Sequence, residues 1–174
     1  MFARDGLGAS LGDVAQEAGV GVASIYRRFD NKNDLIQALL ERRFPPIVER
    51  MTRGLTSDDP WGVFVDEFRQ SAREYASDRG FRELVIGAVT GSFGWARGSE
   101  PDRLRDSLTH WTGQVESVIG QLIRRAQDAG ALRSDVTGSV ILQLSLAMQS
   151  IAGFGSDEDY DSALTVVIDG LRAR

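Results

Sequence analysis

The sequence predicts an all-α fold, in which an N-terminal helix-turn-helix unit precedes a bundle of longer helices. Apolar residues recur at helical spacing through most of the chain, and serine, asparagine and aspartate stand where they can cap helices. A glycine-containing turn near the N-terminus separates two short helical stretches. We expect the helix-turn-helix unit to occupy residues 1–46 and the bundle to occupy residues 47–174.

Residues 10–34 carry the most specific signal. Ser10 can cap a helix with Asp13 as its capping-box partner, and apolar residues then follow at i, i+3, i+4 and i+7. A Gly-Val-Gly turn ends this helix, because glycine adopts left-handed backbone at low cost. A second helix follows over residues 22–28 and carries a tyrosine and two adjacent arginines. This arrangement is typical of a helix-turn-helix whose second helix enters the major groove of DNA.

This stretch resembles the DNA-binding region of TetR-family transcriptional regulators, with the pattern S-L-x-D-V-A-x-x-A-G-V-x-x-x-S-I-Y-R-R-F-x-N-K-x-D-L-I. The resemblance is strong over residues 2–40. Residues 130–136 and 169–173 more weakly resemble ligand-domain segments of actinobacterial-type members of the family. The resemblance implies a homodimer with an all-helical domain that binds an effector.

The first eight residues depart from the family pattern. Family members have a first helix of several turns that packs across the helix-turn-helix, and only its last residues, 2–6, are recognisable here. We expect upstream residues to be absent from the sequence. A mis-set start and a degraded DNA-binding unit are the alternatives, and the sequence leaves all three open.

The next helix links the helix-turn-helix to the bundle. Asn31 can cap this helix with Asp34 as its partner, and apolar residues continue from there at helical spacing. Pro45 and Pro46 interrupt the pattern, because a proline has no amide hydrogen and its ring clashes with the preceding turn. We therefore expect a kink or break near Phe44.

The central part of the bundle is predicted to contain three helices. Asp59 and Pro60 begin the first, which carries an apolar stripe, and the others span residues 81–89 and 101–129. Residues 90–100 are rich in glycine but include two aromatic side chains. That combination suits a lid or a partly buried connection.

The last two helices are expected to form the dimer interface. The helix over residues 136–154 is apolar on two faces, so both must be buried, and the helix capped by Ser156 has a single apolar stripe. The simplest arrangement pairs both helices with their copies from a second chain. The residues expected at this interface are Leu142, Leu146, Gln149, Leu164, Val167, Ile168 and Leu171.

The candidate DNA-contacting residues form two groups. The donors suited to phosphate oxygens are Ser10, Ser24, Tyr26, Arg28 and Lys32. The family resemblance places a second group near the bases: Gly12, Gly21, Val22, Ala23 and Arg27. Of these, only Arg27 can make a bidentate contact to guanine, whereas the other four offer close approach and apolar contact to thymine methyl groups. A solvated helix surface is the alternative for any single residue.

An effector pocket among the central helices would combine aromatic side chains with a few polar groups. The candidate residues are Trp61, Phe64, Phe68, Phe93, Trp95, His110, Trp111, Gln114 and Met148. Aromatic residues at helical spacing more often form plain core, and that alternative stands for each of them. An effector bound here would be hydrophobic or aromatic, and we expect no cofactor.

Composition argues against an enzyme or a metalloprotein. The absence of cysteine rules out disulfides, thiolate zinc sites and thiol nucleophiles, and a single histidine argues against a His-rich metal centre. Glycine-rich residues 6–12 fit neither the dinucleotide nor the P-loop spacing, and the hydrolase motif G-x-S-x-G is missing. The acidic run over residues 157–161 is better explained as favourable charge at a helix N-terminus than as a metal site.

The sequence also bears on location and on charged partners. It has neither the run of roughly 18 apolar residues that spans a bilayer nor a signal peptide, so we expect a cytoplasmic protein without a membrane partner. The net charge is −5, but residues 1–53 hold eight Lys and Arg against seven Asp and Glu, whereas residues 54–174 hold twelve against eighteen. DNA binding would therefore depend on the local placement of Arg27, Arg28 and Lys32.

Together these observations predict a dimeric, ligand-responsive transcriptional regulator. We expect a repressor that binds a palindromic double-stranded DNA operator and is released by a small hydrophobic or aromatic effector. The alternative is a dimeric helical module for small-molecule binding or protein interaction that has lost DNA binding. A further helix encoded upstream would favour the regulator.

Overall fold

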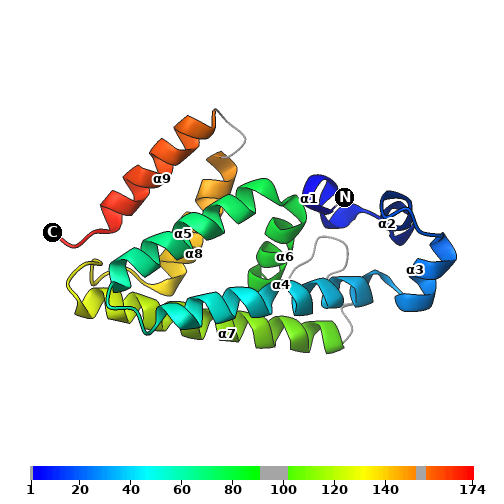
Figure 1. Cartoon of the computed structure of the whole chain (residues 1–174), viewed down its shortest axis with the longest axis horizontal. Helices are drawn as coiled ribbons and strands as arrows, with labels where there is room; N and C mark the ends of the chain where they lie inside the picture. The colour runs from blue at the N-terminus through cyan, green and yellow to red at the C-terminus, as the bar shows by residue number, and fades with distance from the viewer. Residues whose placement is uncertain (1, 91–101, 152–155) are drawn as a thin grey trace. The chain divides into compact units, whose positions relative to one another are not determined.

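A computed structural model describes residues 2–90, 102–151 and 156–174, and the regular elements in these ranges are helices, which confirms the predicted all-α fold. In chain order they are α1 (Phe2–Asp5), the 3-10 helix η1 (Gly6–Gly8), α2 (Leu11–Glu17), α3 (Val22–Arg28), α4 (Lys32–Gly54), α5 (Pro60–Ser77), α6 (Arg79–Thr90), α7 (Asp102–Asp128), α8 (Gly138–Ile151) and α9 (Asp157–Leu171) (Figure 1).

The chain forms two compact units, each built from two separate parts of the sequence. The first unit contains residues 1–46 and 77–113, and the second contains residues 47–76 and 114–174. The division after residue 46 falls where the sequence suggests a domain boundary. However, α6 and the first part of α7 belong to the same unit as the helix-turn-helix.

Side-chain hydrogen bonds start three helices where the sequence predicts them. At α2, Ser10 Oγ accepts the Asp13 amide at 3.1 Å, and the Asp13 carboxylate accepts the Ser10 amide at 2.8 Å. Ser156 and Asp159 form the same reciprocal capping box at α9, at 3.2 and 3.0 Å. At α4, Asn31 Oδ1 accepts two backbone amides at 2.8 and 3.2 Å. These three capping predictions are confirmed.

The linking helix α4 continues through Pro45 and Pro46, so of the kink or break predicted near Phe44 the break is wrong, and the kink stays a prediction. The prolines remove the amide partners of the Glu41 and Arg42 carbonyl groups. Because both of these residues are exposed, water can supply the missing hydrogen bonds. The division between the two units nevertheless falls directly after Pro46.

Aromatic rings join three helices in the first unit. The ring centroid of Phe44 in α4 lies 6.1 Å from that of Phe81 in α6 and 6.3 Å from that of Trp111 in α7. The guanidinium of Arg43 lies 5.3 Å from the Phe81 ring centroid and also pairs with Asp78, the residue before α6. These contacts pack α4, α6 and α7 together within the unit that also contains the helix-turn-helix.

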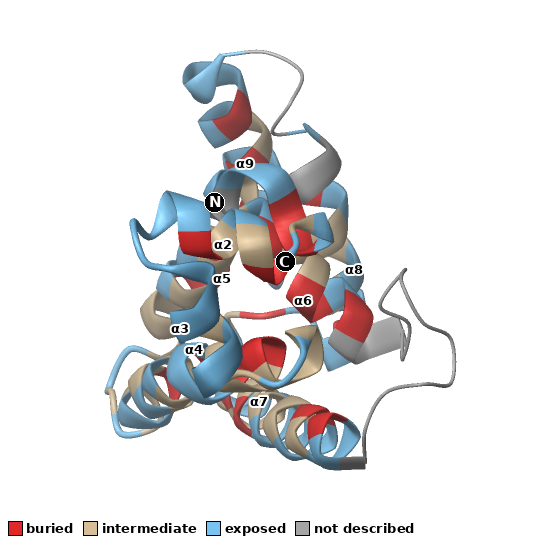
Figure 2. Ribbon diagram, turned by 90° about the vertical axis from the view of Figure 1, so that its right-hand side faces the viewer, coloured by how far each residue is buried: buried red, intermediate tan, exposed pale blue. Residues whose placement is uncertain are grey.

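The second unit has a core that includes residues of α5, α7, α8 and α9. Along α5, the rings of Trp61, Phe64 and Phe68 stack in a row, with centroid separations of 5.7 and 6.3 Å. Met148 of α8 packs into the same core. The buried stripe of α9 completes it with Tyr160, Leu164, Ile168 and Leu171, and Figure 2 shows buried positions of this kind in red.

Candidate nucleic-acid interface

The angle between α2 and α3 is set by a tight turn at Gly19. Its φ is +65°, in the left-handed region that glycine tolerates best. The Gly19 amide donates to the Gln16 carbonyl at 3.2 Å, and the Val20 amide donates to the Ala15 carbonyl at 3.0 Å. The second helix then begins at Val22, as predicted. The helix-turn-helix is therefore shaped by short-range hydrogen bonds.

The α3 helix is open to solvent along its whole length. None of its residues is buried, and Figure 2 shows it in the colours of exposed and intermediate residues. Val22 and Tyr26 keep 50% and 52% of their surfaces exposed. A helix of a globular protein normally buries one apolar stripe. An exposed helix with adjacent arginines, a tyrosine and a valine is thus available to a partner surface.

Arg27 is hydrogen-bonded within its own helix. Its Nη2 donates to Ser24 Oγ at 3.0 Å, and the guanidinium of Arg28 lies 5.8 Å from the ring centroid of Phe29. These are exposed contacts, so their exchange for contacts with DNA costs little. Ser24 and Arg27 are therefore hydrogen-bonded to each other in the free protein. Their expected roles on DNA differ: Ser24 is expected to bind phosphate and Arg27 to read bases.

The other predicted DNA-contacting residues lie on the same stretch. The exposed members are Ser10, Gly21, Val22, Ala23, Ser24, Tyr26, Arg27 and Arg28, and the half-buried members are Gly12 and Lys32. Burial lowers the pKa of Lys32, while the negative charge of Glu83 in α6 acts in the opposite direction. Sequence reasoning did not single out Glu83, because nothing in the local pattern of α6 connects it to the helix-turn-helix.

Two family models cover most of the chain. Residues 1–39 match the family described as bacterial regulatory proteins, tetR family. Residues 59–173 match the family described as transcriptional regulator SbtR-like, C-terminal domain. The chain belongs to the TetR family. It is therefore a transcriptional regulator of that family, with a helix-turn-helix DNA-binding domain.

Individual relatives agree with this assignment to the TetR family. The chain is 30% identical over 91 residues to the HTH-type transcriptional regulator AlkX of Mycobacterium tuberculosis, a stretch that covers 52% of this chain and 42% of AlkX. The chain thus spans less than half the length of this curated relative.

Solved TetR-family structures share the fold over nearly the whole chain. A TetR regulatory protein from Mycobacterium vanbaalenii is 27% identical with a TM-score of 0.62, covering 99% of this chain and 88% of that chain. The ketosteroid transcriptional regulator KstR2 of Mycobacterium tuberculosis is 17% identical with a TM-score of 0.68, covering 100% of this chain and 90% of that chain.

The residues predicted to line an effector pocket are divided between the two units. Four of them share the core of the second unit: Trp61, Phe64, Phe68 and Met148. His110 and Trp111 belong to the first unit, where their ring centroids lie 4.8 Å apart, and Gln114 is exposed. Phe93 and Trp95 lie outside the described residues.

Two buried polar atoms of the second unit have no hydrogen-bond partner among the residues that the structure describes, Tyr160 Oη and Arg50 Nη2. Burial raises the pKa of Tyr160. Arg50 Nε donates to both carboxylate oxygens of Glu67, at 3.0 and 3.1 Å. An unsatisfied buried polar group costs about 1–3 kcal/mol, so each atom is a candidate contact for a water or a ligand. Spacing along the chain gives no signal for either atom.

The two segments that more weakly resemble family ligand domains meet in the structure. Leu132 and Arg172 form an isolated antiparallel bridge. The Arg133 amide donates to the Leu171 carbonyl at 3.1 Å, and the Ala173 amide donates to the Ala131 carbonyl at 3.0 Å. Neither segment carries a sequence pattern that indicates this pairing. Their pairing ties the end of α9 to the connection between α7 and α8.

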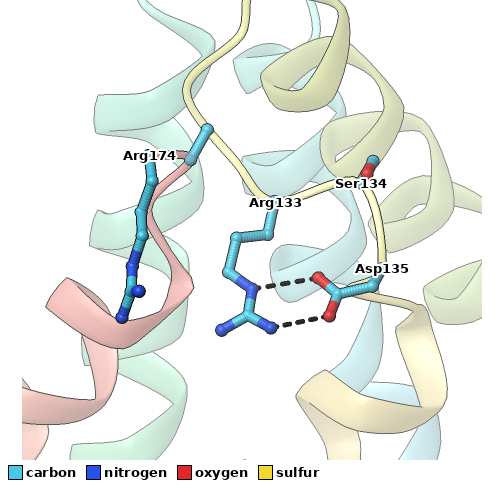
Figure 3. A pocket seen from close by; sticks show the side chains of 5 residues that line it. Arg133, Ser134, Asp135 and Arg174 are labelled. Carbon is cyan, nitrogen blue, oxygen red and sulfur yellow. Dashed lines mark hydrogen bonds and ion pairs between the residues drawn. The ribbon is translucent and has the colours of Figure 1, made fainter.

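A shallow hollow of about 450 Å³ lies beside this bridge. It is lined by Arg133, Ser134, Asp135, Ala173 and Arg174 (Figure 3). Arg133 donates two hydrogen bonds to Asp135, at 3.0 and 2.6 Å, which hold the pKa of that carboxyl below its ordinary value. None of the predicted effector-binding residues that the structure describes lines this hollow.

Three residues predicted at the dimer interface lie in the core of their own chain: Leu164, Ile168 and Leu171 are 2%, 4% and 5% exposed. They have little surface left to offer a partner. Val166, on the opposite face of α9, is 72% exposed. Leu142, Leu146 and Val167 are half-buried, and the side chain of Gln149 lies outside the described residues. An apolar stripe predicts burial, but not whether the same chain or a second chain supplies the cover.

The described ranges of the chain contain no helix that is long and apolar enough to cross a membrane. Within the same ranges, no three or more histidine, aspartate or glutamate side chains are grouped in a way that could hold a metal ion.

Proposed function

We propose that this TetR-family protein is a repressor that binds a palindromic operator as a dimer, with one α3 helix per half-site in the major groove. The observation that carries this proposal is α3 itself, which buries no residue and exposes Tyr26, Arg27 and Arg28. A two-fold dimer repeats this helix, and half-sites one turn of DNA apart require a spacing of about 34 Å.

The contacts proposed for α3 divide between reading and positioning. Arg27 would leave Ser24 and make a bidentate contact to guanine, while Val22 meets a thymine methyl group. Ser24, once released, and Arg28 would bind phosphate oxygens, which fix the register of the helix without reading sequence. Residues 1–53 hold only slightly more basic than acidic side chains, which implies a modest affinity for non-specific DNA.

A dimer interface requires apolar side chains that are not already buried in the core of one chain. On α8 and α9, the large apolar residues that remain exposed are Val140, Ile151 and Val166, and Val166 is the most exposed of them. Together with the half-buried Leu146 and Val167, they offer an apolar face to a second copy of the chain. The dimer interface proposed here therefore centres on Val166, with the buried stripe of α9 behind it.

The proposed effector is a small, largely apolar or aromatic molecule bound in the second unit. The aromatic row of α5 and Met148 provide an apolar lining, and the Tyr160 hydroxyl in the same core, which has no hydrogen-bond partner in the part of the chain that the structure describes, provides a polar contact. The effector would release DNA by favouring a dimer geometry in which the α3 spacing no longer fits the operator. It can shift that equilibrium only through its different affinities for the two geometries.

Fluorescence anisotropy with the DNA that flanks the gene, at several salt concentrations, tests the proposal. The wild type should bind tightly, with an affinity that falls steeply as salt rises. Arg27→Ala should cost about 1–3 kcal/mol on the operator and reduce discrimination against unrelated DNA. Arg28→Ala, the matched control, should weaken binding to all sequences alike and lower the salt slope by about one.

Two results would contradict this proposal. Equal loss of specificity in both arginine variants would remove the base-reading role of Arg27. Absence of binding by the wild type would shift the proposed function to a helical ligand-binding module without DNA recognition, and a screen with apolar and aromatic compounds would follow.

A further inference from the structure

Glu83, in the second turn of α6, makes a long-range contact that DNA binding by α3 does not explain. Its Oε2 accepts a hydrogen bond from the backbone amide of Leu7 in η1, at 2.6 Å. Leu7 is 1% exposed, and both residues belong to the first unit. A short hydrogen bond from an amide to a carboxylate is about twice as strong as one between neutral groups. The contact joins the segment just before α2 to α6.

Gly6 is shaped for this contact. Its φ is +73°, and a Cβ added there would collide with the carboxylate of Glu83. The collision involves the whole end of the Glu83 side chain, because both oxygens and the carboxyl carbon are close. Glycine at this position therefore allows the turn and also leaves room for the carboxylate.

The same carboxylate also acts on the other side of the helix-turn-helix. Arg79, one turn earlier in α6, holds Glu83 Oε1 at 2.8 Å. The charge of Glu83 also raises the pKa of Lys32, against the effect of burial. Leu7 precedes α2 and Lys32 is the first residue of α4, so Glu83 interacts with both flanks of the segment that carries α2 and α3. Figure 1 shows α1 beside α6.

We propose that Glu83 is a positioning residue that fixes the helix-turn-helix to α6, so that operator affinity depends on the hydrogen bond that its side chain accepts from the Leu7 amide. This inference rests on the proposed DNA-binding function. Because this hydrogen bond joins α6 to the segment directly before α2, a movement of α6 would carry the start of the helix-turn-helix with it, and the turn at Gly19 would keep its shape. Glu83 itself touches no DNA in this proposal.

The test combines operator affinity with hydrogen exchange of the Leu7 amide, followed by NMR on the full protein. Glu83→Ala should raise the Leu7 exchange rate and weaken operator binding, each by about tenfold or more, because a hydrogen bond to a charged acceptor is lost. Glu83→Gln should restore both values to within about threefold of the wild type, since its amide oxygen still accepts the Leu7 proton. If Glu83→Ala only lowered the overall stability, exchange would rise at many amides, and Glu83→Gln would not restore the Leu7 amide in particular.

A second route to the same contact uses Gly6→Ala, which should displace the carboxylate and reproduce the affinity loss of Glu83→Ala. In the double variant the losses should be less than additive, because the contact can be removed only once. Glu116→Ala in α7 removes an equally charged but exposed carboxylate and should leave both the Leu7 exchange and the operator affinity unchanged.

The outcomes separate this inference from the proposed function. Wild-type affinity in Glu83→Ala, or an affinity loss in Glu83→Gln as large as in Glu83→Ala, would overturn the positioning role while leaving the repressor proposal in place. A wild type that binds no DNA would overturn the proposed function, and this inference with it.

Discussion

The helices α3 and α9 differ in how much of their surface the folded chain buries. The α3 helix buries no residue, whereas α9 buries Tyr160, Leu164, Ile168 and Leu171. The position of α3 relative to α2 depends on the local turn at Gly19, whereas α9 is held by packing against helices that include the distant α5 and α7. Substitutions in α9 should therefore change stability, and substitutions around α3 should change DNA affinity.

The largest effect is expected at Leu164, which sits on the buried face of α9. Leu164→Ala should lower the free energy of unfolding by about 2–5 kcal/mol, through lost burial and the cavity that remains. Val166→Ala, two residues away on the exposed face, should leave the stability of a single chain nearly unchanged. Urea unfolding at a fixed protomer concentration measures both.

These α9 variants also test the dimer surface. If Val166 lies at the interface, Val166→Ala should raise the dimer dissociation constant, measured by sedimentation, while Leu164→Ala acts on folding. A large loss of chain stability in Val166→Ala would mean that its face is also part of the core. It would contradict the assignment of one buried and one exposed face to α9.

A smaller effect is expected at Gly19, where the left-handed backbone forms the turn before α3. Gly19→Ala should cost about 1–2 kcal/mol, because a Cβ is disfavoured at its φ of +65° even though no atom lies near enough to clash. Operator affinity should fall as the angle between α2 and α3 relaxes. Thermal unfolding and anisotropy measure the two effects.

The matched control for Gly19 is Gly113, inside α7, where an added Cβ meets open space. Gly113→Ala should stabilise the protein by up to about 1 kcal/mol, because alanine is the better helix former. A loss of stability in Gly113→Ala would show that space and helix propensity alone do not decide the outcome, and would weaken the explanation given for Gly19.

The smallest expected effect concerns the caps that α2 and α9 have in common. Hydrogen bonds from Ser10 and Ser156 lower the pKa values of Asp13 and Asp159. A lowered folded-state pKa stabilises the fold above the ordinary carboxyl range, and that contribution is lost as pH falls below about 4. Asp159→Asn should flatten the acid limb of the stability curve, followed by circular dichroism. An unchanged acid limb would show that the α9 cap contributes little to pH dependence.

The parts of the fold that could be predicted from the sequence are those set by neighbours in the chain. Ser10, Asn31 and Ser156 cap helices through residues two or three positions away, and Gly19 ends α2 through its own backbone conformation. Pro45 and Pro46 were misjudged because the outcome depends on whether exposed carbonyl groups can turn to water, and no local rule decides that.

The candidate site divides in the same way. The helix-turn-helix pattern predicts which residues could face DNA, and the structure leaves the α3 members of that set unburied. The contact between Glu83 and Leu7 joins residues 76 positions apart, and neither residue type signals it. The Tyr160 hydroxyl, which has no partner among the described residues, likewise becomes visible only when the core is assembled, because a buried tyrosine usually finds a partner.

The backbone bridge between Leu132 and Arg172 closes a loop of about 40 residues that contains α8 and α9, and closing such a loop costs chain entropy once, when its ends meet. After the ends have met, neither helix can open widely without breaking the bridge or stretching the loop. The two helices should therefore unfold and exchange their amides as one cooperative segment. A destabilising substitution at the C-terminal end of α9 should then raise amide exchange at the start of α8, although the two points are far apart along the chain.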